Sequence, residues 1–263
     1  MQCPACGRGV RRGTQFCPGC GQNLLAAVTP AASPAGVKAS SAPVGSRESS
    51  RRFVEHWAEL KRLAWLFGLL LATSFVFGIA WRSNRSPWLD VAMAAIDALI
   101  ILVVVAGRWP KLRFLFQVRP TSARDSVAMV GIAILFVVLG TAYFRTIEWL
   151  GVPMLSATAT LQEAGWPLWS MLLLISVMPA IFEELAFRGV IQSSLERVLS
   201  GREAWVIQAA LFSVLHLGPL MFPSHFVMGL CFGYMRRRSR SIYPGMLLHG
   251  CWNALVVLGE LPR

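Results

Sequence analysis

The chain has 263 residues, of which 55% are apolar and only 14% are charged. This balance excludes a disordered chain and departs from the average soluble domain in the direction of a membrane protein. The 25 Lys and Arg against 13 Asp and Glu give a net charge of +12. These basic residues lie between hydrophobic blocks and do not alternate with aromatics in one patch, which argues against a nucleic-acid binder. The apolar stretches are continuous, unlike the alternating strands of a membrane barrel.

The first 25 residues contain four cysteines, arranged as two CxxC pairs that are ten residues apart: Cys3, Cys6, Cys17 and Cys20. This spacing is typical of two knuckles that hold one tetrahedral ion, so residues 1–25 are predicted to form a zinc ribbon with a structural zinc. So short a segment cannot bury a core, and the metal would supply its folding energy. Iron in a rubredoxin-like site and recruitment of a cytosolic protein partner are the alternatives. Thiolate ligands require a reducing compartment, which indicates a cytosolic N-terminus.

The next two segments are expected to lead into a transmembrane domain at 63–263. Residues 26–50 are rich in Ala, Pro, Ser and Gly without periodicity and are predicted to be a flexible linker. Residues 51–62 mix aromatic and charged side chains, as an amphipathic lead-in at the membrane surface does. No cleavable signal peptide is expected, because the first hydrophobic run starts only after this polar region.

Seven hydrophobic blocks follow: 63–81, 89–106, 127–144, 168–187, 204–216, 222–235 and 242–259. With a cytosolic N-terminus, every loop on the inside carries more Lys and Arg than any loop on the outside. The sequence therefore predicts an all-α polytopic membrane protein with about seven transmembrane helices and a small N-terminal zinc-ribbon module. The fifth and sixth blocks are short for a core about 30 Å thick, so we expect a short hairpin that lines a chamber open to the cytosol.

Ionisable residues inside the blocks are the candidates for function, since each costs about 2.5 to 3.5 kcal/mol at the bilayer centre. Glu184 and Arg188 are four residues apart in the favourable order for an ion pair, whereas Glu183 points about 100° away and is unpaired. Asp97 is interpreted as a packing or topology feature, the lone cysteines of the blocks as small core-facing residues, and His225 as an interhelical hydrogen-bond donor. The full set of candidate site residues is Glu183, Glu184, Arg188, His216, His249 and Asn253.

Three motifs on successive blocks carry a resemblance to a known family. They are the pair Glu183-Glu184 followed by Arg188 and Gly189, then Phe212-x-x-x-His216, then His249-x-x-x-Asn253. In order and spacing they resemble the motifs of the CAAX protease and bacteriocin-processing family of intramembrane proteases, over about residues 165–260. The resemblance leaves the first three blocks, the linker and the ribbon uncovered.

The resemblance implies an intramembrane endopeptidase with a catalytic core at about 165–260. It makes Glu183 the catalytic glutamate, supported by Glu184 and Arg188, with His216 as the partner of a water or metal. His249 and Asn253 would complete the polar wall, where hydrogen-bond donors can stabilise an oxyanion. A catalytic zinc among the glutamates and histidines is the competing version. The absence of an HExxH motif favours the glutamate version.

The resemblance also implies a substrate and a location. It suggests a CAAX-like or bacteriocin-type peptide, entering from the membrane or the cytosol, and a bacterial inner-membrane enzyme with the lipid bilayer as its environment. Two other classes of protein remain as alternatives. One is a non-catalytic membrane scaffold or immunity protein whose ribbon recruits a cytosolic partner, and the other is a proton-coupled transporter, although no internal repeat is visible.

Overall fold

The computed structural model describes residues 2–3, 9–10 and 44–261. The chain divides into two compact units, Met1–Arg47 and Glu48–Arg263. In the first, Gln2 and Gly9 form an isolated antiparallel bridge, and the buried Cys3 packs with Val10. The other three cysteines of the predicted ribbon and most of the predicted linker lie outside the described residues, so the zinc ribbon stays a prediction.

The first helix, α1 (Val44–Ser83), begins before the end of the expected linker and runs unbroken through the expected lead-in. Pro43 is the last proline before Pro87. Because proline is the residue that most strongly interrupts a helix, nothing in this interval stops the helix from extending back to Val44. The ends of the expected linker at residue 50 and of the expected lead-in at residue 62 therefore do not coincide with the ends of a helix.

Two further long helices follow. α2 (Pro87–Leu112) starts with proline at its first position, where the missing N–H has no intrahelical partner to lose, and it continues into a 3-10 turn, η1 (Arg113–Phe116). α3 (Ala123–Trp149) is capped by Ser122, whose hydroxyl accepts a hydrogen bond from the Asp125 amide at 3.1 Å.

After a short helix, α4 (Ala159–Glu163), the chain enters a continuous helix of 28 residues from Leu168 to Leu195, which we call the central helix. Its parts are α5 (Leu168–Met171), π-helical η2 (Leu172–Val177), α6 (Met178–Glu184), π-helical η3 (Leu185–Ile191) and α7 (Gln192–Leu195). It extends eight residues beyond the predicted fourth block. Most of the added residues are polar or glycine, and they can continue the helix because protein, not lipid, surrounds them: all of them are buried.

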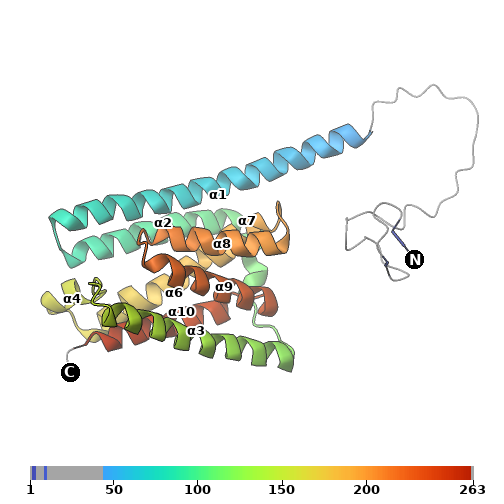
Figure 1. Ribbon diagram of the computed structural model, residues 1–263. Coiled ribbons are helices and arrows are strands. Elements are labelled where there is room, and N and C mark those ends of the chain that lie inside the picture. The colour runs from blue at the N-terminus through green and yellow to red at the C-terminus, as the bar shows by residue number, and fades with distance from the viewer. Residues whose placement is uncertain (1, 4–8, 11–43, 262–263) are drawn as a thin grey trace, which may run out of the picture. The chain divides into compact units, whose positions relative to one another are not determined.

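The last three helices are α8 (Gly201–Leu215), α9 (Met221–Ser239) and α10 (Tyr243–Gly259). α8 and α9 form a hairpin whose tip is fastened by two hydrogen bonds: Tyr143 of α3 donates to the Leu220 carbonyl at 2.6 Å, and Ser213 donates to the Phe222 carbonyl at 2.6 Å. In Figure 1 this tip stops short of the turn between α1 and α2. α8 has 15 residues, but α9 has 19 and extends beyond the predicted sixth block at both ends, so the short hairpin expected from block length stays a prediction.

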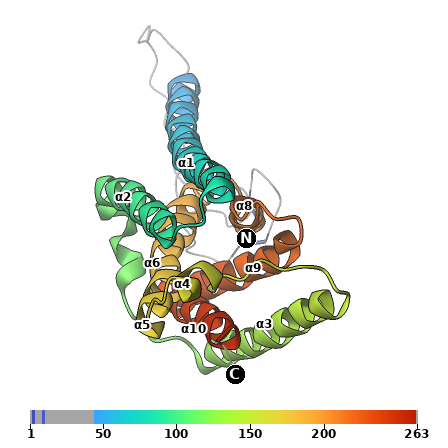
Figure 2. The same cartoon turned by 90° about the vertical axis from the view of Figure 1, so that its left-hand side faces the viewer.

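Within this second unit, successive helices run back and forth along one direction (Figure 1). The view along the helices in Figure 2 has α1 and α3 on opposite sides, with α6, α9 and α10 between them. The end where α1 joins α2 is called the turn end below. The other end carries a buried carboxylate, Glu59, which accepts hydrogen bonds from Arg108 at 2.5 Å, Lys111 at 3.2 Å and Arg197 at 2.8 Å. We call it the basic end.

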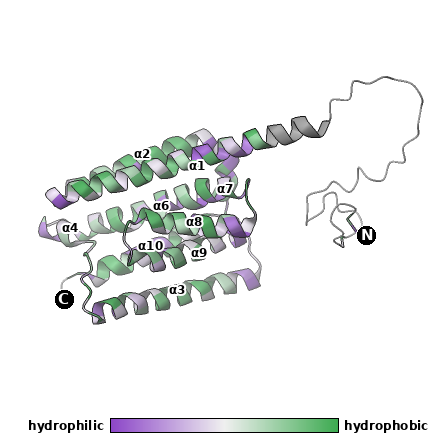
Figure 3. Cartoon of the chain, turned by 45° about the horizontal axis from the view of Figure 1, so that its top comes forward, coloured by the Kyte–Doolittle hydropathy of each residue, from purple (hydrophilic) through white to green (hydrophobic). Residues whose placement is uncertain are grey.

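The described helices support an integral membrane protein. Four of them are long and apolar enough to cross a membrane: Phe53–Ser83, Pro87–Phe116, Ala123–Trp149 and Leu168–Leu195. Figure 3 shows hydrophobic residues along the middle of α1, α2 and α3 and hydrophilic residues at their ends. α8 has only 15 residues, about 22 Å at 1.5 Å per residue, and falls short of a bilayer core. Seven crossings therefore stay a prediction.

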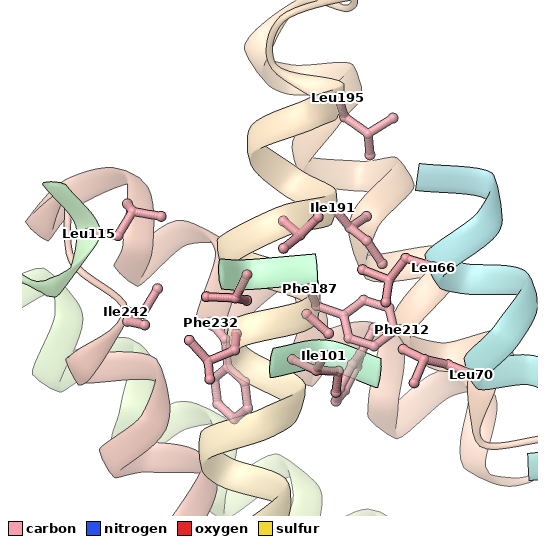
Figure 4. Packing of buried hydrophobic residues seen from close by; sticks show 14 of the residues in the cluster. Leu66, Leu70, Ile101, Leu115, Phe187, Ile191, Leu195, Phe212, Phe232 and Ile242 are labelled. Carbon is pink, nitrogen blue, oxygen red and sulfur yellow. The ribbon is translucent and has the colours of Figure 1, made fainter. Parts of the chain in front are cut away.

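The apolar core wraps around the central helix. Phe187 of the central helix meets Phe212 of α8 edge to face, with ring centroids 5.0 Å apart. Leu66, Leu70 and Ile101 complete this side, and Figure 4 shows them gathered around the two rings. The helix that carries the two glutamates is thus held on several sides by close packing, which fixes the direction of their side chains.

Candidate active site

The centre of the site is a buried ion pair on the central helix. Arg188 donates to the Glu184 carboxylate at 2.7 Å, and both side chains are fully buried. The guanidinium lies over the rings of Phe212, at 4.4 Å, and Phe232, at 5.0 Å. It also donates to the Gly229 carbonyl at 3.4 Å. The pairing expected from the four-residue spacing is confirmed, and the two aromatic faces add cation–π contact to it.

Two glycines make room for this pair. A Cβ at Gly245 of α10 would lie 2.6 Å from the Glu184 carboxylate, and a Cβ at Gly229 of α9 would lie 2.7 Å from the Ala209 backbone. α10 can therefore approach the carboxylate, and α9 can approach α8, only where no side chain is present. The ion pair is enclosed by backbone on two sides.

Glu183 and Glu184 are neighbours in sequence but differ in access. The Glu183 side chain keeps 26% of its surface exposed, whereas Glu184 keeps none. His249 of α10 lies between them: its Nε2 is 3.8 Å from a Glu183 oxygen and its Nδ1 is 3.4 Å from a Glu184 oxygen. The accessible carboxylate thus has an imidazole beside it, and the buried one is held by arginine.

His216 caps the end of α8, and its ring lies against that of His225, which was not among the candidate site residues. The rings of His216 and His225 lie 3.8 Å apart, and each Nδ1 is 2.9 Å from the carbonyl four residues earlier, Phe212 and Met221 respectively. Because only an N–H can donate to a carbonyl, these contacts place the proton of each neutral ring on Nδ1. Both Nε2 atoms are then acceptors.

Asn253 ties α10 to the π-helical part of the central helix. Pro179 has no N–H, so the Ile175 carbonyl loses the donor that an α-helix would supply. The Asn253 amide donates to that carbonyl at 3.0 Å, and Ser176 donates to the Gly250 carbonyl at 2.7 Å. π-helical turns of this kind occur frequently at functional sites. Here they lie on both sides of the two glutamates.

Glu183 and His216 line one cavity of about 550 Å³. Its wall also includes Asp90 and Asp97 of α2, whose carboxylates accept hydrogen bonds from Thr160 at 3.5 Å and Thr73 at 2.6 Å. Asp97 is therefore a wall residue of the cavity and not only a packing feature.

The cavity lies nearer to one end of the second unit, and the expectation of a chamber open to the cytosol stays a prediction. The wall residues from α1 and α2 come from the halves of these helices that adjoin their connecting turn, so the cavity lies towards the turn end. The central helix continues to Leu195, which puts Glu183 near its middle and not at its end, as the fourth block had implied.

Within the described residues, no group of three or more His, Cys, Asp and Glu side chains is arranged to hold a metal ion. The catalytic zinc that the resemblance leaves open stays a prediction. The side chains of the site can nevertheless act on a water molecule directly, as acceptors and donors of protons.

Comparison with known proteins gives one match, which falls on this site. Residues 165–255 match the family of type II CAAX prenyl endopeptidases that are Rce1-like. The matched segment includes every candidate catalytic residue and omits α1, α2 and α3. No curated protein and no solved structure matches the chain. The match supports a CAAX-type intramembrane endopeptidase as the general class of protein.

Sequence reasoning missed part of the site. His225 had no partner at helical spacing, and its stacking on His216 depends on the hairpin that folds α9 against α8. Gly245 gave no signal, because the role of a glycine is visible only when its neighbour is known. Asp97 was visible as an isolated acid in an apolar block, but the helix on which it lies is outside the resemblance.

Proposed function

We propose that the chain is a glutamate-dependent intramembrane endopeptidase in which Glu183 is the general base. The observation that carries this proposal is the contrast between two adjacent carboxylates. One lines a cavity with histidines near it, and the other is sealed in an ion pair. A general base must reach a water and a substrate, and only Glu183 has that access.

In the proposed reaction Glu183 takes a proton from a water molecule in the cavity. The oxygen of that water forms a bond to the carbonyl carbon of the scissile peptide, and the carbonyl oxygen becomes an oxyanion. The tetrahedral intermediate then collapses, the bond from carbon to nitrogen breaks, and Glu183 returns the proton to the leaving amine. No other reactant is needed.

His216 and His249 have different proposed roles. The unprotonated Nε2 of His216 would accept a hydrogen bond from the attacking water and orient it. His249, whose Nε2 is 3.8 Å from Glu183, would donate to the carboxylate or to the oxyanion when it carries its proton on that nitrogen. Glu184 and Arg188 act as positioning residues, because they fix the helix on which Glu183 lies.

We also propose that the basic end faces the cytosol. Arg108, Lys111 and Arg197 gather there, and cytosolic ends of membrane helices are enriched in such residues. The N-terminus would then be cytosolic, and the cavity would lie in the other half of the membrane. A peptide of CAAX-like or bacteriocin type that is anchored in the bilayer would reach it from the lipid.

The test compares cells that carry wild type with cells that carry Glu183→Gln, which preserves shape and removes the base. New protein termini in the membrane fraction are identified by mass spectrometry. Termini produced by wild type should fall at least about 100-fold in the variant while its membrane expression is kept. Identical sets of termini in the two strains would end the assignment.

The matched control is Asp97→Asn, the same change from carboxylate to amide in the wall of the same cavity. The introduced amide keeps an oxygen that can accept the hydrogen bond of Thr73. Cleavage should stay within about fivefold of wild type, because this carboxylate has no part in the proton transfer. An equal loss in both variants would point to the electrostatics of the cavity as the cause, and not to a base at Glu183.

A further inference from the structure

A second cavity, of about 410 Å³, lies at the basic end and shares no residue with the active-site cavity. It is formed by η1 and the residues after it, by Glu196 just after α7, and by the end of α9. Four of its residues are arginines, namely Arg119, Arg236, Arg237 and Arg240. One is the acid Glu196, and two are the apolar side chains of Phe114 and Leu115.

The one acid in the wall is already neutralised. Glu196 accepts hydrogen bonds from Arg236 at 2.5 Å and from Gln192 at 3.1 Å. Within the described part of the chain, Arg119, Arg237 and Arg240 have no carboxylate within ion-pair distance. Three of the four arginines therefore bring positive charge that the described residues leave uncompensated.

Arg236 supplies a second, independent sign of a ligand. It is buried to 5% exposure, and its two terminal nitrogens donate to Glu196 and to Ser193, at 2.5 and 2.7 Å. Its Nε–H is buried and has no acceptor. A buried guanidinium donor without a partner is unfavourable, so an oxygen of a bound anion in this cavity would satisfy a group that the protein leaves unsatisfied.

The backbone also holds one arginine in a costly conformation. Arg240 has φ 54°, in the left-handed region that favours glycine, at the C-terminal cap of α9. The following turn is braced by Ser239, whose hydroxyl accepts from the Ser241 amide at 3.2 Å. Strained residues of this kind persist where the surrounding structure or a ligand compensates for them.

The position of the cavity indicates the source of the anion. Phe114 and Leu115 come directly after α2, in the last turn of a candidate membrane span, Pro87–Phe116. Trp109 and Tyr243, both more than 40% exposed, lie nearby in the sequence at the ends of α2 and α10, as aromatic residues do at the membrane surface. The arginines are thus at the depth of lipid headgroups, with apolar side chains beside them.

We propose that this arginine cavity binds the phosphate headgroup of an anionic phospholipid. Arg119, Arg237 and Arg240 contact the phosphate oxygens, and the Nε–H of Arg236 donates to the same group. Guanidinium groups suit this purpose because their paired N–H donors match two phosphate oxygens. Phe114, which is 39% exposed, contacts the start of the acyl chains.

The test measures binding by the full-length protein in nanodiscs of phosphatidylcholine to which phosphatidylglycerol is added. Bound lipid is counted by native mass spectrometry, and thermal stability is followed in parallel. Wild type should retain phosphatidylglycerol and gain stability. The double variant Arg119→Gln, Arg240→Gln should bind it at least about tenfold more weakly. The matched control is Arg113→Gln. Arg113 lies in η1 beside Phe114 but does not line the cavity, so this variant should bind lipid as wild type does.

Two outcomes would overturn the proposal. In the first, wild type shows no preference for phosphatidylglycerol over phosphatidylcholine. In the second, inorganic phosphate alone reproduces the stabilisation and displaces no lipid, which would make this a site for a soluble anion. If the double variant does not fold, the single variant Arg237→Gln, of an exposed residue, replaces it, and unchanged lipid retention in that variant likewise counts against the proposal.

Discussion

The central helix and the first three helices are both apolar and long, yet they use polar residues in opposite ways. In the central helix 44% of its most apolar window is buried in protein, against 17%, 17% and 11% for α1, α2 and α3. The central helix carries a fully buried ion pair, whereas α1 and α2 keep their buried pair at the basic end. The central helix also has the lowest mean hydropathy of the four, 1.7 against 2.1 to 2.5, so the helix that carries the candidate site differs from the others both in hydropathy and in the amount of protein around it.

The largest difference between the two regions is expected when one arginine is removed from each and the free energy of unfolding is measured. Arg188→Met leaves Glu184 buried with no cation within ion-pair distance except histidine, and the free energy of unfolding should fall by about 3 to 5 kcal/mol. Arg108→Met leaves Glu59 with Lys111 and Arg197, so its loss should be smaller, about 1 to 2 kcal/mol. Unfolding in a denaturing detergent measures both. Equal losses of unfolding free energy in the two variants would mean that the two buried ion pairs contribute equally to stability.

A smaller effect is expected when a methyl group is added in each region. Gly229→Ala places a Cβ 2.7 Å from the Ala209 backbone, which must shift, and should cost about 1 to 3 kcal/mol. Gly131→Ala on α3 meets nothing within 4 Å and should leave stability unchanged or raise it by up to about 1 kcal/mol. The same unfolding assay compares the two. If Gly229→Ala left the free energy of unfolding unchanged, the close approach of α8 and α9 at this glycine would not contribute to stability.

An isosteric substitution tests the hydrogen bond from Asn253 of α10 to the Ile175 carbonyl of the central helix. Asn253→Asp keeps the shape but loses the N–H that satisfies the Ile175 carbonyl, and should cost about 1 to 3 kcal/mol. The matched change Asn84→Asp, in the exposed turn between α1 and α2, should be within about 0.5 kcal/mol of wild type. If activity falls in Asn253→Asp while stability does not, the amide acts on the reaction and not on the fold.

The smallest effect concerns the start of α8, outside the membrane-spanning segments. Ser200 and Glu203 form a capping box, and Ser200→Ala should cost about 1 kcal/mol. The hydrogen bonds from Ser200 lower the pKa of the exposed Glu203 below its usual value near 4.5. A lowered pKa in the folded state means that this contribution is present above pH 4.5 and is lost as the pH falls through the lowered value. Stability measured between about pH 3 and 6 should therefore decline less with acid in Ser200→Ala than in wild type.

Some of the site could be predicted from sequence because helix geometry is local. The four-residue spacing of Glu184 and Arg188 predicted their ion pair, and the 100° step predicted that Glu183 would point elsewhere. The length of the fifth block predicted the short helix α8. Each of these inferences needs only residues within one or two helices.

The remainder depends on contacts between distant segments. The tail of the central helix mixes polar residues and glycine with apolar ones, and only the enclosing helices explain why Arg188 and Gln192 are buried in it. The cavity wall from α2 and the stacking of His225 on His216 likewise require the tertiary arrangement. The position of Glu183 along its helix was misjudged for the same reason, since the helix continues eight residues beyond the end of the predicted block.

The buried carboxylate of Glu59 has a consequence for the order in which the chain is assembled during synthesis. Its first buried partner, Arg108, is 49 residues later, but Arg197 is 138 residues later. Arg62 of the same helix is also near this carboxylate, at 3.8 Å, but its side chain is mostly exposed, so the buried cation beside Glu59 comes only with Arg108. Glu59 of α1 can therefore pair with α2 once Arg108 has been synthesised. Arg197 joins the same carboxylate after the central helix has been synthesised. We therefore expect the pair of Glu59 with Arg108 to form before the contact of Glu59 with Arg197.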